Sequence, residues 1–175
     1  MHDLDHVLDT AERLVSEGGA LSVRALAAAA GVSNGSIYHA FGSIGALLGR
    51  VWLRAAGDFL DLQAASADEA DSPVETVVAA AAAPAVFARD RPHAARMLVT
   101  VRRDDLLGPA LPDDLADRLL ALDRRVVALL TRLARAMWGR GDGAAVEVLT
   151  IPPREGSGPC PPCTRRTRCS SSTSA

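Results

Sequence analysis

The chain has no lysine: all 19 of its basic residues are arginine, set against 21 acidic residues in a length of 175. Aromatic residues make up only 3% of it, so its core must be built mainly from alanine, leucine and valine. Its longest uncharged apolar run, 77–88, is too short to span a bilayer and contains Pro84. The missing lysine and the abundant alanine indicate GC-rich coding DNA, which concerns codon usage and not mechanism.

Several kinds of site are also missing from the sequence. It contains no nucleophile elbow, no glycine-rich loop to cradle a phosphate and no cluster of carboxylates with histidine, since its four histidines are scattered. We therefore expect no enzyme, no cofactor and no metal. The first nine residues, MHDLDHVLD, are acidic and lack the apolar stretch of an export signal. This start predicts a cytoplasmic protein without membrane contacts.

One stretch of the chain has no acidic residue at all. Between Gly18 and Gly57 there is no Asp or Glu, whereas Arg24, Arg50 and Arg54 lie inside this window. The chain as a whole carries a net charge of −2. A basic window in an otherwise acidic protein would orient that window toward DNA. Because the cations are few, we expect DNA binding with a shallow salt dependence.

Two short helices around a tight turn are predicted inside this window, in the sequence SVRALAAAAGVSNGSIYHAFGSIGALL. The first has apolar residues at helical spacing behind Ser22, which can cap its N-terminus. Gly31 ends that helix, because glycine tolerates the left-handed backbone that such a turn needs. Ser33 can cap the second helix, and Ile37 and Phe41, four residues apart, would anchor it to the core. This is the helix-turn-helix design, which predicts DNA binding.

The same stretch resembles the N-terminal domain of TetR-type transcriptional regulators, whose pattern it follows at fixed spacing. The matching positions are Ser22, Arg24, Leu26, Ala27, Ala30, Gly31, Val32, Ser33, Gly35, Ile37, Tyr38, Phe41, Ser43 and Leu47. The sequence departs from the pattern at Ile44, where the family usually has a lysine that helps to hold the DNA backbone. Asn34 also stands where a basic residue is common.

The resemblance implies which residues contact DNA. The first turn of the second helix, 34–36, would face base edges, where Gly35 permits a close approach. Helix N-termini favour anions, which supports phosphate contacts at the starts of both helices. Each of these contacts has an alternative without a role in DNA binding. Tyr38 could be a half-buried aromatic residue, His39 a solvated histidine and Arg24 an ordinary surface charge. The complete predicted set is Ser22, Arg24, Ser33, Asn34, Gly35, Ser36, Tyr38 and His39.

Further helices are predicted along the rest of the chain. They are expected at about 4–18, 43–63, 72–88 (bent or interrupted near Pro84), 91–104, 112–139 and from 143 on, with an acidic loop at 64–71. The helix at 112–139 carries an apolar seam in steps of four and three residues, a spacing that packs against other helices in the manner of coiled coils. The seam residues are Leu115, Leu119, Leu122, Val126, Leu129, Leu133 and Ala136. We interpret this seam as core and not as a ligand site.

We predict an all-α fold with a three-helix DNA-binding domain at 1–45 and a helical effector-binding and dimerisation domain at 46–149. In the resembled family, an effector bound in the second domain changes the distance between the two DNA-reading heads of a homodimer, and operator affinity falls. Few polar groups fall among the candidate wall residues, which favours a hydrophobic effector, and ordinary core packing is the alternative for each residue. The candidates are Trp52, Phe59, Phe87, Met97, Val101 and Met137.

The last segment, 150–175, breaks the helical pattern and is predicted to be disordered or frame-shifted. From Ile151 on it holds five Pro, five Ser, four Arg and all three Cys, and almost no aliphatic residue. Relatives end with two more helices that pair with a second subunit, and this segment cannot form them, so the second domain is incomplete. Cys160, Cys163 and Cys169 have the spacing of half a zinc site, or of a redox motif. We favour a shifted reading frame, because GC-rich codons read out of frame give this composition.

Together these features predict a TetR-type transcriptional regulator, a repressor released by a small, largely apolar effector. Its partners would be a palindromic double-stranded DNA operator, the effector and a second copy of the chain. The alternative is a helical ligand-binding or protein-interaction module whose DNA binding is weak or lost. Salt-sensitive binding to random duplex DNA separates the two hypotheses.

Overall fold

The computed structural model describes residues 4–18, 21–102, 106 and 112–150, and every regular element in these ranges is an α-helix. These helices are α1 (Leu4–Ser16), α2 (Val23–Ala30), α3 (Asn34–Phe41), α4 (Ile44–Asp68), α5 (Pro73–Asp90), α6 (Pro92–Thr100), α8 (Asp113–Trp138) and α9 (Gly143–Thr150). The predicted all-α fold is therefore confirmed. None of these helices is long and apolar enough to cross a membrane.

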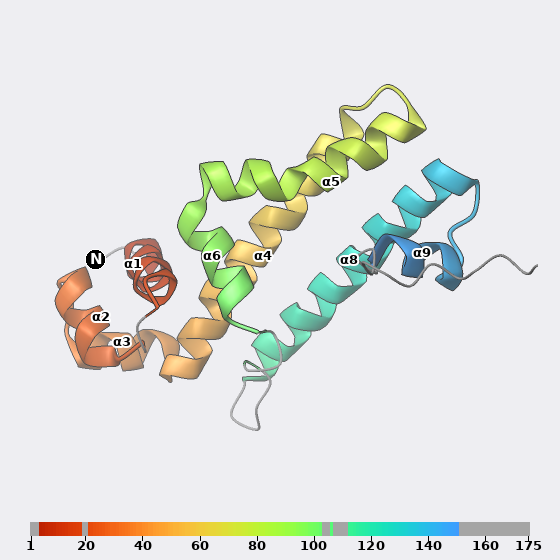
Figure 1. Cartoon of the computed structure of the whole chain (residues 1–175). Coiled ribbons are helices and arrows are strands. Elements are labelled where there is room, and N and C mark those ends of the chain that lie inside the picture. Colours follow the sequence, from red (N-terminus) through yellow and green to blue (C-terminus); the bar gives the residue numbers. More distant parts are fainter. Residues whose placement is uncertain (1–3, 19–20, 103–105, 107–111, 151–175) are drawn as a thin grey trace, which may run out of the picture.

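The first three helices form a small head at one end of the molecule, and α4 leads out of the head into the body (Figure 1). The apolar side of α1 is buried at Val7, Ala11 and Val15, against residues of α2, α3 and α4. The same hydrophobic cluster continues into the body, because it also includes Ala94 and Met97 of α6. The head is thus packed against α6 as well as linked to the body by α4.

Helix α4 is longer than the sequence predicted, and the expectation of a loop beginning at residue 64 is wrong. The helix continues to Asp68. Inside this last part the Ser66 hydroxyl donates to the Leu62 carbonyl at 2.9 Å, so a polar side chain is satisfied within the helix. Arg132 of α8 also pairs with the Asp68 carboxylate and donates to the Ala64 carbonyl at 3.3 Å. These contacts with α8, a helix far away in the sequence, hold the last residues of α4, which lie beyond the apolar pattern that the sequence shows.

Helix α6 is shorter than predicted, ending at Thr100 and not near residue 104. Val101 takes up an extended backbone, with φ −97° and ψ 110°. Its carbonyl accepts a hydrogen bond at 3.1 Å from the indole nitrogen of Trp52, a residue of α4. The end of α6 is therefore attached to the helix that leads back to the head.

Helices α4 and α8 run parallel, and three ion pairs join them at a constant separation of 64 residues. Arg50 pairs with Asp114 at 3.5 Å, Asp61 pairs with Arg125, and Asp68 pairs with Arg132. The predicted apolar seam of α8 packs into the core, where Leu115, Leu119, Leu122, Leu129 and Leu133 are buried. Within that seam, Val126 is 39% exposed and Ala136 is half-buried.

The other predicted helix ends are close to the observed ones. Ser72 caps α5, Pro73 stands in its first turn, and Pro84 lies inside the helix without ending it. Helix α9 begins at Gly143, where the sequence indicated a further helix. The predicted tail from residue 151 on, with its three cysteines, lies outside the residues that the structure describes.

Candidate nucleic-acid interface

All three helices that begin in or beside the helix-turn-helix are capped by a serine. The hydroxyls of Ser22, Ser33 and Ser43 accept backbone N–H groups three residues ahead, at distances of 3.0–3.1 Å. Each serine satisfies one of the N–H groups that a helix start leaves without an intrahelical partner. Ser33 also lies 2.8 Å from the Ser36 hydroxyl, so these two side chains order one another. The predicted capping roles of Ser22 and Ser33 are confirmed.

The turn between α2 and α3 depends on Gly31. This residue has φ 67° and ψ 29°, the left-handed region that glycine enters without strain. The Val32 N–H donates to the Ala27 carbonyl at 3.0 Å and closes the end of α2. Gly31, Val32, Ser33 and Ser36 line a hollow of about 330 Å³ at this turn.

Helix α3 is held to the core by two residues only. Ile37 and Phe41 are 2% and 6% exposed, respectively, and both belong to the hydrophobic cluster of the head. The remaining positions of α3 face solvent. This amphipathic division was predicted from the spacing of the two residues, and it leaves the first turn of α3 free.

All eight predicted DNA-binding residues lie on the surface. The exposed residues are Ser22, Arg24, Ser33, Asn34, Gly35, Ser36, Tyr38 and His39. The Tyr38 side chain is 53% exposed, although it is a large aromatic group. Arg24 forms no ion pair with any residue that the structure describes, and it lies in the first turn of α2, where the helix dipole disfavours a cation. Local stability therefore does not account for an arginine at this position.

The helix starts differ in charge, although the difference does not divide head from body: α1 has Asp5 in its first turn, whereas α6 and α9 have no acid there. Acidic residues occupy the first turns of α5 and α8, as Glu75 in one and Asp113 and Asp114 in the other. The first turns of α2, α3 and α4 contain none. Because an acid at a helix start neutralises the positive end of its dipole, the head keeps three helix N-termini available to anions.

Two of the three arginines of the basic window have acidic partners in the structure, so the window carries less unpaired positive charge than the sequence indicated. Arg54 pairs with Asp9 at 2.7 Å and with Glu12 at 3.3 Å. Arg50 pairs with Asp114 at 3.5 Å, so of the three window arginines only Arg24 is exposed and forms no ion pair with a described residue. The acidic groups come from outside the window, so the charge count along the sequence could not show them.

A group of polar side chains joins the head to the body, and sequence reasoning missed it. Glu12 of α1 is 7% exposed, and its carboxylate lies 3.3 Å from Arg54 and 3.7 Å from Arg91. Arg91, at the corner between α5 and α6, also pairs with Asp58 of α4 at 3.0 Å. Glu12 interrupts the apolar side of α1, and this isolated acid was the signal that could have pointed to the contact.

A second polar contact links α1 to α6 one turn further along. The Ser16 hydroxyl lies 2.7 Å from Nδ1 of His93, across 77 residues of sequence. Ser16 is 4% exposed and also donates to the Arg13 carbonyl at 2.7 Å. The head is thus fixed to α6 by polar as well as apolar contacts.

Five of the six predicted effector-wall residues come together between α4, α5 and α6. Phe87 and Met97 belong to the buried cluster of the head and body, and Trp52, Phe59 and Val101 pack against it. The Phe59 and Phe87 rings meet edge to face, with 5.4 Å between their centres. Met137 is 37% exposed near the end of α8 and is not part of this cluster. The five residues are packed together, so an effector that enters here must move them apart.

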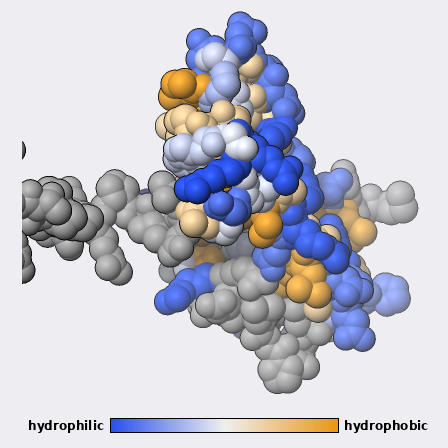
Figure 2. Space-filling model, turned by 90° about the vertical axis from the view of Figure 1, so that its right-hand side faces the viewer, coloured by the Kyte–Doolittle hydropathy of each residue, from blue (hydrophilic) through white to orange (hydrophobic). Residues whose placement is uncertain are grey.

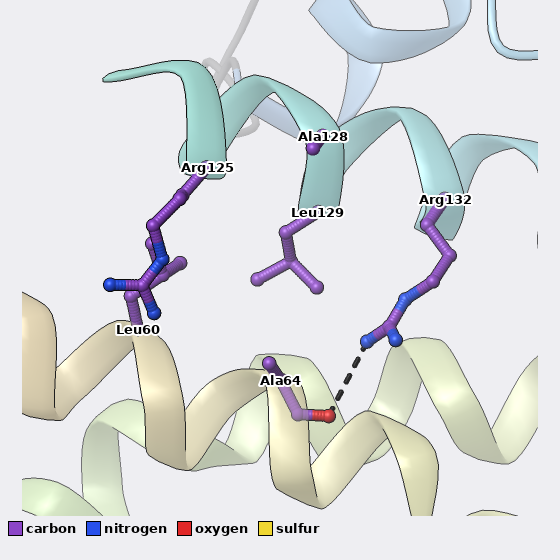
Figure 3. Close-up of a pocket in the computed structure, with 6 residues that line it drawn as sticks. All are labelled: Leu60, Ala64, Arg125, Ala128, Leu129 and Arg132. Carbon is purple, nitrogen blue, oxygen red and sulfur yellow. Dashed lines mark hydrogen bonds between the residues drawn. The ribbon is translucent and has the colours of Figure 1, made fainter. Parts of the chain in front are cut away.

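An open groove lies nearby, between α4 and α8 (Figure 3). It has a volume of about 250 Å³ and an apolar floor, with an arginine at each end. Its lining residues are Leu60, Ala64, Arg125, Ala128, Leu129 and Arg132. The described residues include no group of three or more His, Cys, Asp or Glu side chains placed to hold a metal ion.

Comparison with known protein families gives one match to the head. Residues 7–51 match the family described as bacterial regulatory proteins, tetR family. These residues include α2, α3 and the serine caps described above. No curated protein matches the chain.

Solved structures with a similar fold are TetR-family regulators. A regulator named PfmR from Thermus thermophilus shares 27% identity, with a TM-score of 0.57, over 77% of this chain and 70% of its own. A putative TetR-family regulator from Vibrio parahaemolyticus shares 26% identity, with a TM-score of 0.56, over 75% and 67% of the two chains. The fatty acid degradation regulator FadR from Bacillus halodurans shares 21% identity, with a TM-score of 0.59, over 85% and 86%. The last likeness shows the fold alone.

Proposed function

Because the chain is a TetR-family transcriptional regulator by its N-terminal domain and its fold, we propose that it is a repressor that binds a palindromic DNA operator. A small, largely apolar effector would release it from that operator. The observation that carries DNA binding is the division of α3, in which Ile37 and Phe41 are buried while all eight candidate contact residues are exposed. A chain with this division presents a short polar helix to the major groove.

The proposed contacts divide by chemistry. Asn34 and Ser36 supply side-chain donors and acceptors at the start of α3, suited to base edges, and Gly35 between them leaves room for a base. Arg24 and the Tyr38 hydroxyl suit phosphates, as do the free N–H groups at the helix starts. Ser22, Ser33 and His39 complete the contact surface. Phosphate contacts fix the position on the duplex, and base contacts select its sequence.

Coupling between effector and head is supported by the contacts that join them. Helix α4 belongs to both parts, and α6 is attached to α1 through the Ser16–His93 contact and to α4 through the Trp52–Val101 hydrogen bond. An effector that separates α4 from α6 would therefore change how the head is held. Such an effector has to bind the two arrangements with different affinity, or the operator would not be released.

The first test measures DNA affinity by fluorescence anisotropy with random duplex DNA at several salt concentrations. We expect salt-sensitive binding, and Arg24→Ala should lower the slope of log affinity against log salt by about 1. Arg118→Ala is the matched control, because Arg118 of α8 is also exposed and forms no ion pair with any described residue. Equal slopes for the wild type and Arg24→Ala in a folded protein would contradict the assigned phosphate contact.

Operator choice is tested separately, by selection of bound duplexes from a random pool. Asn34→Ala and Ser36→Ala should change the preferred sequence, whereas Tyr38→Ala should weaken binding to all sequences alike. If Tyr38→Ala changes the selected sequence and the two α3 variants do not, the proposed division of contacts is reversed.

The effector is tested by the fluorescence of Trp52 in a Trp138→Phe background, since the chain has only these two tryptophans. Straight-chain fatty acids and flat aromatic molecules are titrated in parallel. We expect an apolar ligand that changes Trp52 emission and also lowers DNA affinity. A ligand that changes emission while DNA affinity stays constant would separate binding from release and contradict the repressor mechanism.

One observation favours the alternative, a helical module with weak or lost DNA binding. Arg50 and Arg54 are occupied by Asp114, Asp9 and Glu12, and Ile44 stands where the family usually has a lysine. The DNA-facing surface is therefore poor in free cations. The alternative predicts no salt-sensitive binding to random duplex DNA, so the first test decides between the two functions.

A further inference from the structure

The series of ion pairs between α4 and α8 is interrupted at one step. Its three pairs join residues 64 positions apart, and in each of them an arginine faces an aspartate. At the same separation, Arg54 of α4 lies opposite Arg118 of α8. One and two heptads further along α8, Arg125 and Arg132 project toward α4 (Figure 3). The step at Arg54 and Arg118 therefore has two cations, which repel each other, and no acid from either helix.

A hollow of about 310 Å³ lies at this step, and both arginines line it. Gly57 and Ala121, one turn further along each helix, line it as well and are again 64 positions apart. Because neither of them has a long side chain, the two helices leave a space beside the cations. The other lining residues are Leu53, Asp58, Asp61, Leu122 and Arg125.

The two acids that line the hollow are already used by other arginines. Asp58 pairs with Arg91 at 3.0 Å, and Asp61 pairs with Arg125. Arg118 is exposed and forms no ion pair with any residue that the structure describes. Its guanidinium group is therefore available to an anion that enters the hollow.

Arg54 also keeps part of its hydrogen-bonding capacity. Its two carboxylate partners, Asp9 and Glu12 of α1, both contact Nη2, at 2.7 and 3.3 Å. Its Nε is buried and has no hydrogen-bond partner in the described part of the chain. Because a guanidinium group carries five N–H donors in a planar fork, Arg54 can bind a further carboxylate while Nη2 stays with α1.

We propose that this hollow binds the carboxylate of a small organic acid, held between Arg118 and Arg54. The bound carboxylate supplies the negative charge that this step between α4 and α8 lacks. The site is distinct from the packed cluster at which the apolar effector is proposed to enter, since none of the six candidate wall residues lines the hollow. The inference does not depend on DNA binding, because binding of the acid is measured without DNA.

The lining of the hollow decides which kind of anion fits. Leu53 and Leu122, both buried, contribute apolar surface that suits the hydrocarbon part of an organic acid. Arg118 is the lining cation without a carboxylate partner among the described residues, so one negative charge satisfies the site. Asp58 and Asp61 would repel a second negative charge. A monocarboxylate with a short apolar body therefore fits better than a phosphate dianion.

Exposed apolar residues alone do not mark a binding site on this molecule. On the face shown in Figure 2, apolar atoms form small separate patches among hydrophilic ones. Scattered apolar residues of this kind are normal on a protein surface. The hollow differs from them because two facing cations and an apolar lining meet in one concave place.

The test is an NMR titration of the full chain with benzoate and with benzamide, which has nearly the same shape and no charge. The buffer contains little salt and no other carboxylate, because salt screens an exposed cation. We expect benzoate to bind with a dissociation constant of about 1–10 mM, since it is a small ligand, and benzamide to bind about tenfold more weakly. Equal affinities for the two overturn the proposal. Inorganic phosphate that displaces benzoate at a lower concentration than benzoate itself requires overturns the choice of a monocarboxylate.

The cation is tested by Arg118→Gln, which removes the charge and keeps much of the side chain. This change should weaken benzoate binding about tenfold. Arg135→Gln is the matched control, because Arg135 is also exposed on α8, forms no ion pair with any described residue and does not line the hollow. The proposal is wrong if Arg118→Gln and the wild type bind benzoate equally well.

The position of the ligand is tested by filling the hollow while all charges stay in place. Ala121→Leu should weaken benzoate binding by about tenfold or more, because the larger side chain occupies the space beside the two arginines. Ala128→Leu is the matched control, since Ala128 is also exposed, one heptad further along α8, and lines the groove of Figure 3. Circular dichroism checks that both variants fold. If Ala128→Leu weakens binding and Ala121→Leu does not, benzoate lies in the neighbouring groove and the proposed site is wrong.

Discussion

Arg54 of α4 donates to the Glu12 carboxylate of α1 across 3.3 Å, although 42 residues separate the two in sequence. Arg91 approaches the same carboxylate from the corner of α5 and α6, at 3.7 Å. A single acid on the first helix of the head is thus shared by two cations of the body. These contacts matter for function because any change in the position of the head relative to the body must lengthen or break them.

The first prediction concerns the stability of this contact. Glu12→Gln should destabilise the fold by about 1–2 kcal/mol, because Glu12 is buried and its charge is shared by Arg54 and Arg91, although each arginine keeps a second carboxylate, Asp9 or Asp58. The measurement is urea unfolding at neutral pH. Glu17→Gln is the matched control, since the Glu17 pair with Arg13 is about half exposed on both sides, and it should cost less than about 1 kcal/mol. Equal losses for the two variants would show that the shared contact adds nothing.

The second prediction uses two glycines with opposite expected effects. Gly31→Ala should destabilise the fold by about 1–2 kcal/mol, because φ is 67° there and this backbone is strained for alanine. The new Cβ would contact no neighbouring atom, so no packing would offset the strain. Gly57→Ala, in the middle of α4 and equally open, should stabilise by about 0.5–1 kcal/mol. Thermal unfolding of both variants gives the sign directly. A stabilising Gly31→Ala would mean that the turn does not need the left-handed backbone.

The third prediction restores a cation to the start of α4. Ile44→Lys should strengthen binding to duplex DNA and steepen its salt dependence by about one unit of slope, if this position faces the phosphates as the family resemblance implies. Ile44 is half-buried, so a small loss of stability should accompany the gain. Anisotropy at two salt concentrations measures the effect. Val99→Lys on α6, a fully surface position, controls for a general increase in charge.

The fourth prediction concerns an exposed ion pair at the end of α5. Arg89 donates to both carboxylate oxygens of Asp90, at 2.7 and 3.1 Å, and this contact lowers the pKa of Asp90. Arg89→Ala should therefore raise that pKa, which NMR titration of the carboxyl carbon measures.

The sign of the accompanying pH effect follows from the direction of this shift. Since the pKa of Asp90 is lowered by folding, its contribution to stability is present above the unfolded pKa and is lost as pH falls through the folded pKa. In Arg89→Ala, the free energy of unfolding should therefore depend less on pH over that acid range. At neutral pH the variant should lose only the contribution of the Arg89–Asp90 pair. An unchanged Asp90 titration would show that the two side chains do not meet in solution.

Local features of the head could be predicted because each depends on neighbours in sequence. The caps at Ser22 and Ser33 and the turn at Gly31 involve residues three or four positions away. The burial of Ile37 and Phe41 follows from the helical period alone. Because these features depend only on residues close in sequence, residue type and spacing are enough to predict them.

The contacts that link distant segments could not be predicted in this way. The sequence marks Arg50 and Arg54 as free cations, and only the packing of α1 and α8 on α4 shows their acidic partners. The extension of α4 to Asp68 has the same cause, since it is held by Arg132 from α8. Ion pairs between helices depend on the register of packing, which no local pattern encodes.

The apolar cluster shared by the head and α6 has a consequence for the order in which the protein assembles. Val7, Leu26 and Val51 enter this cluster early in synthesis, but Met97, which is fully buried in it, is made much later. A growing chain that has just completed its helix-turn-helix therefore still lacks the residues of α5 and α6 that complete this cluster. The apolar core of the DNA-reading head is therefore complete only after α6 has been synthesised.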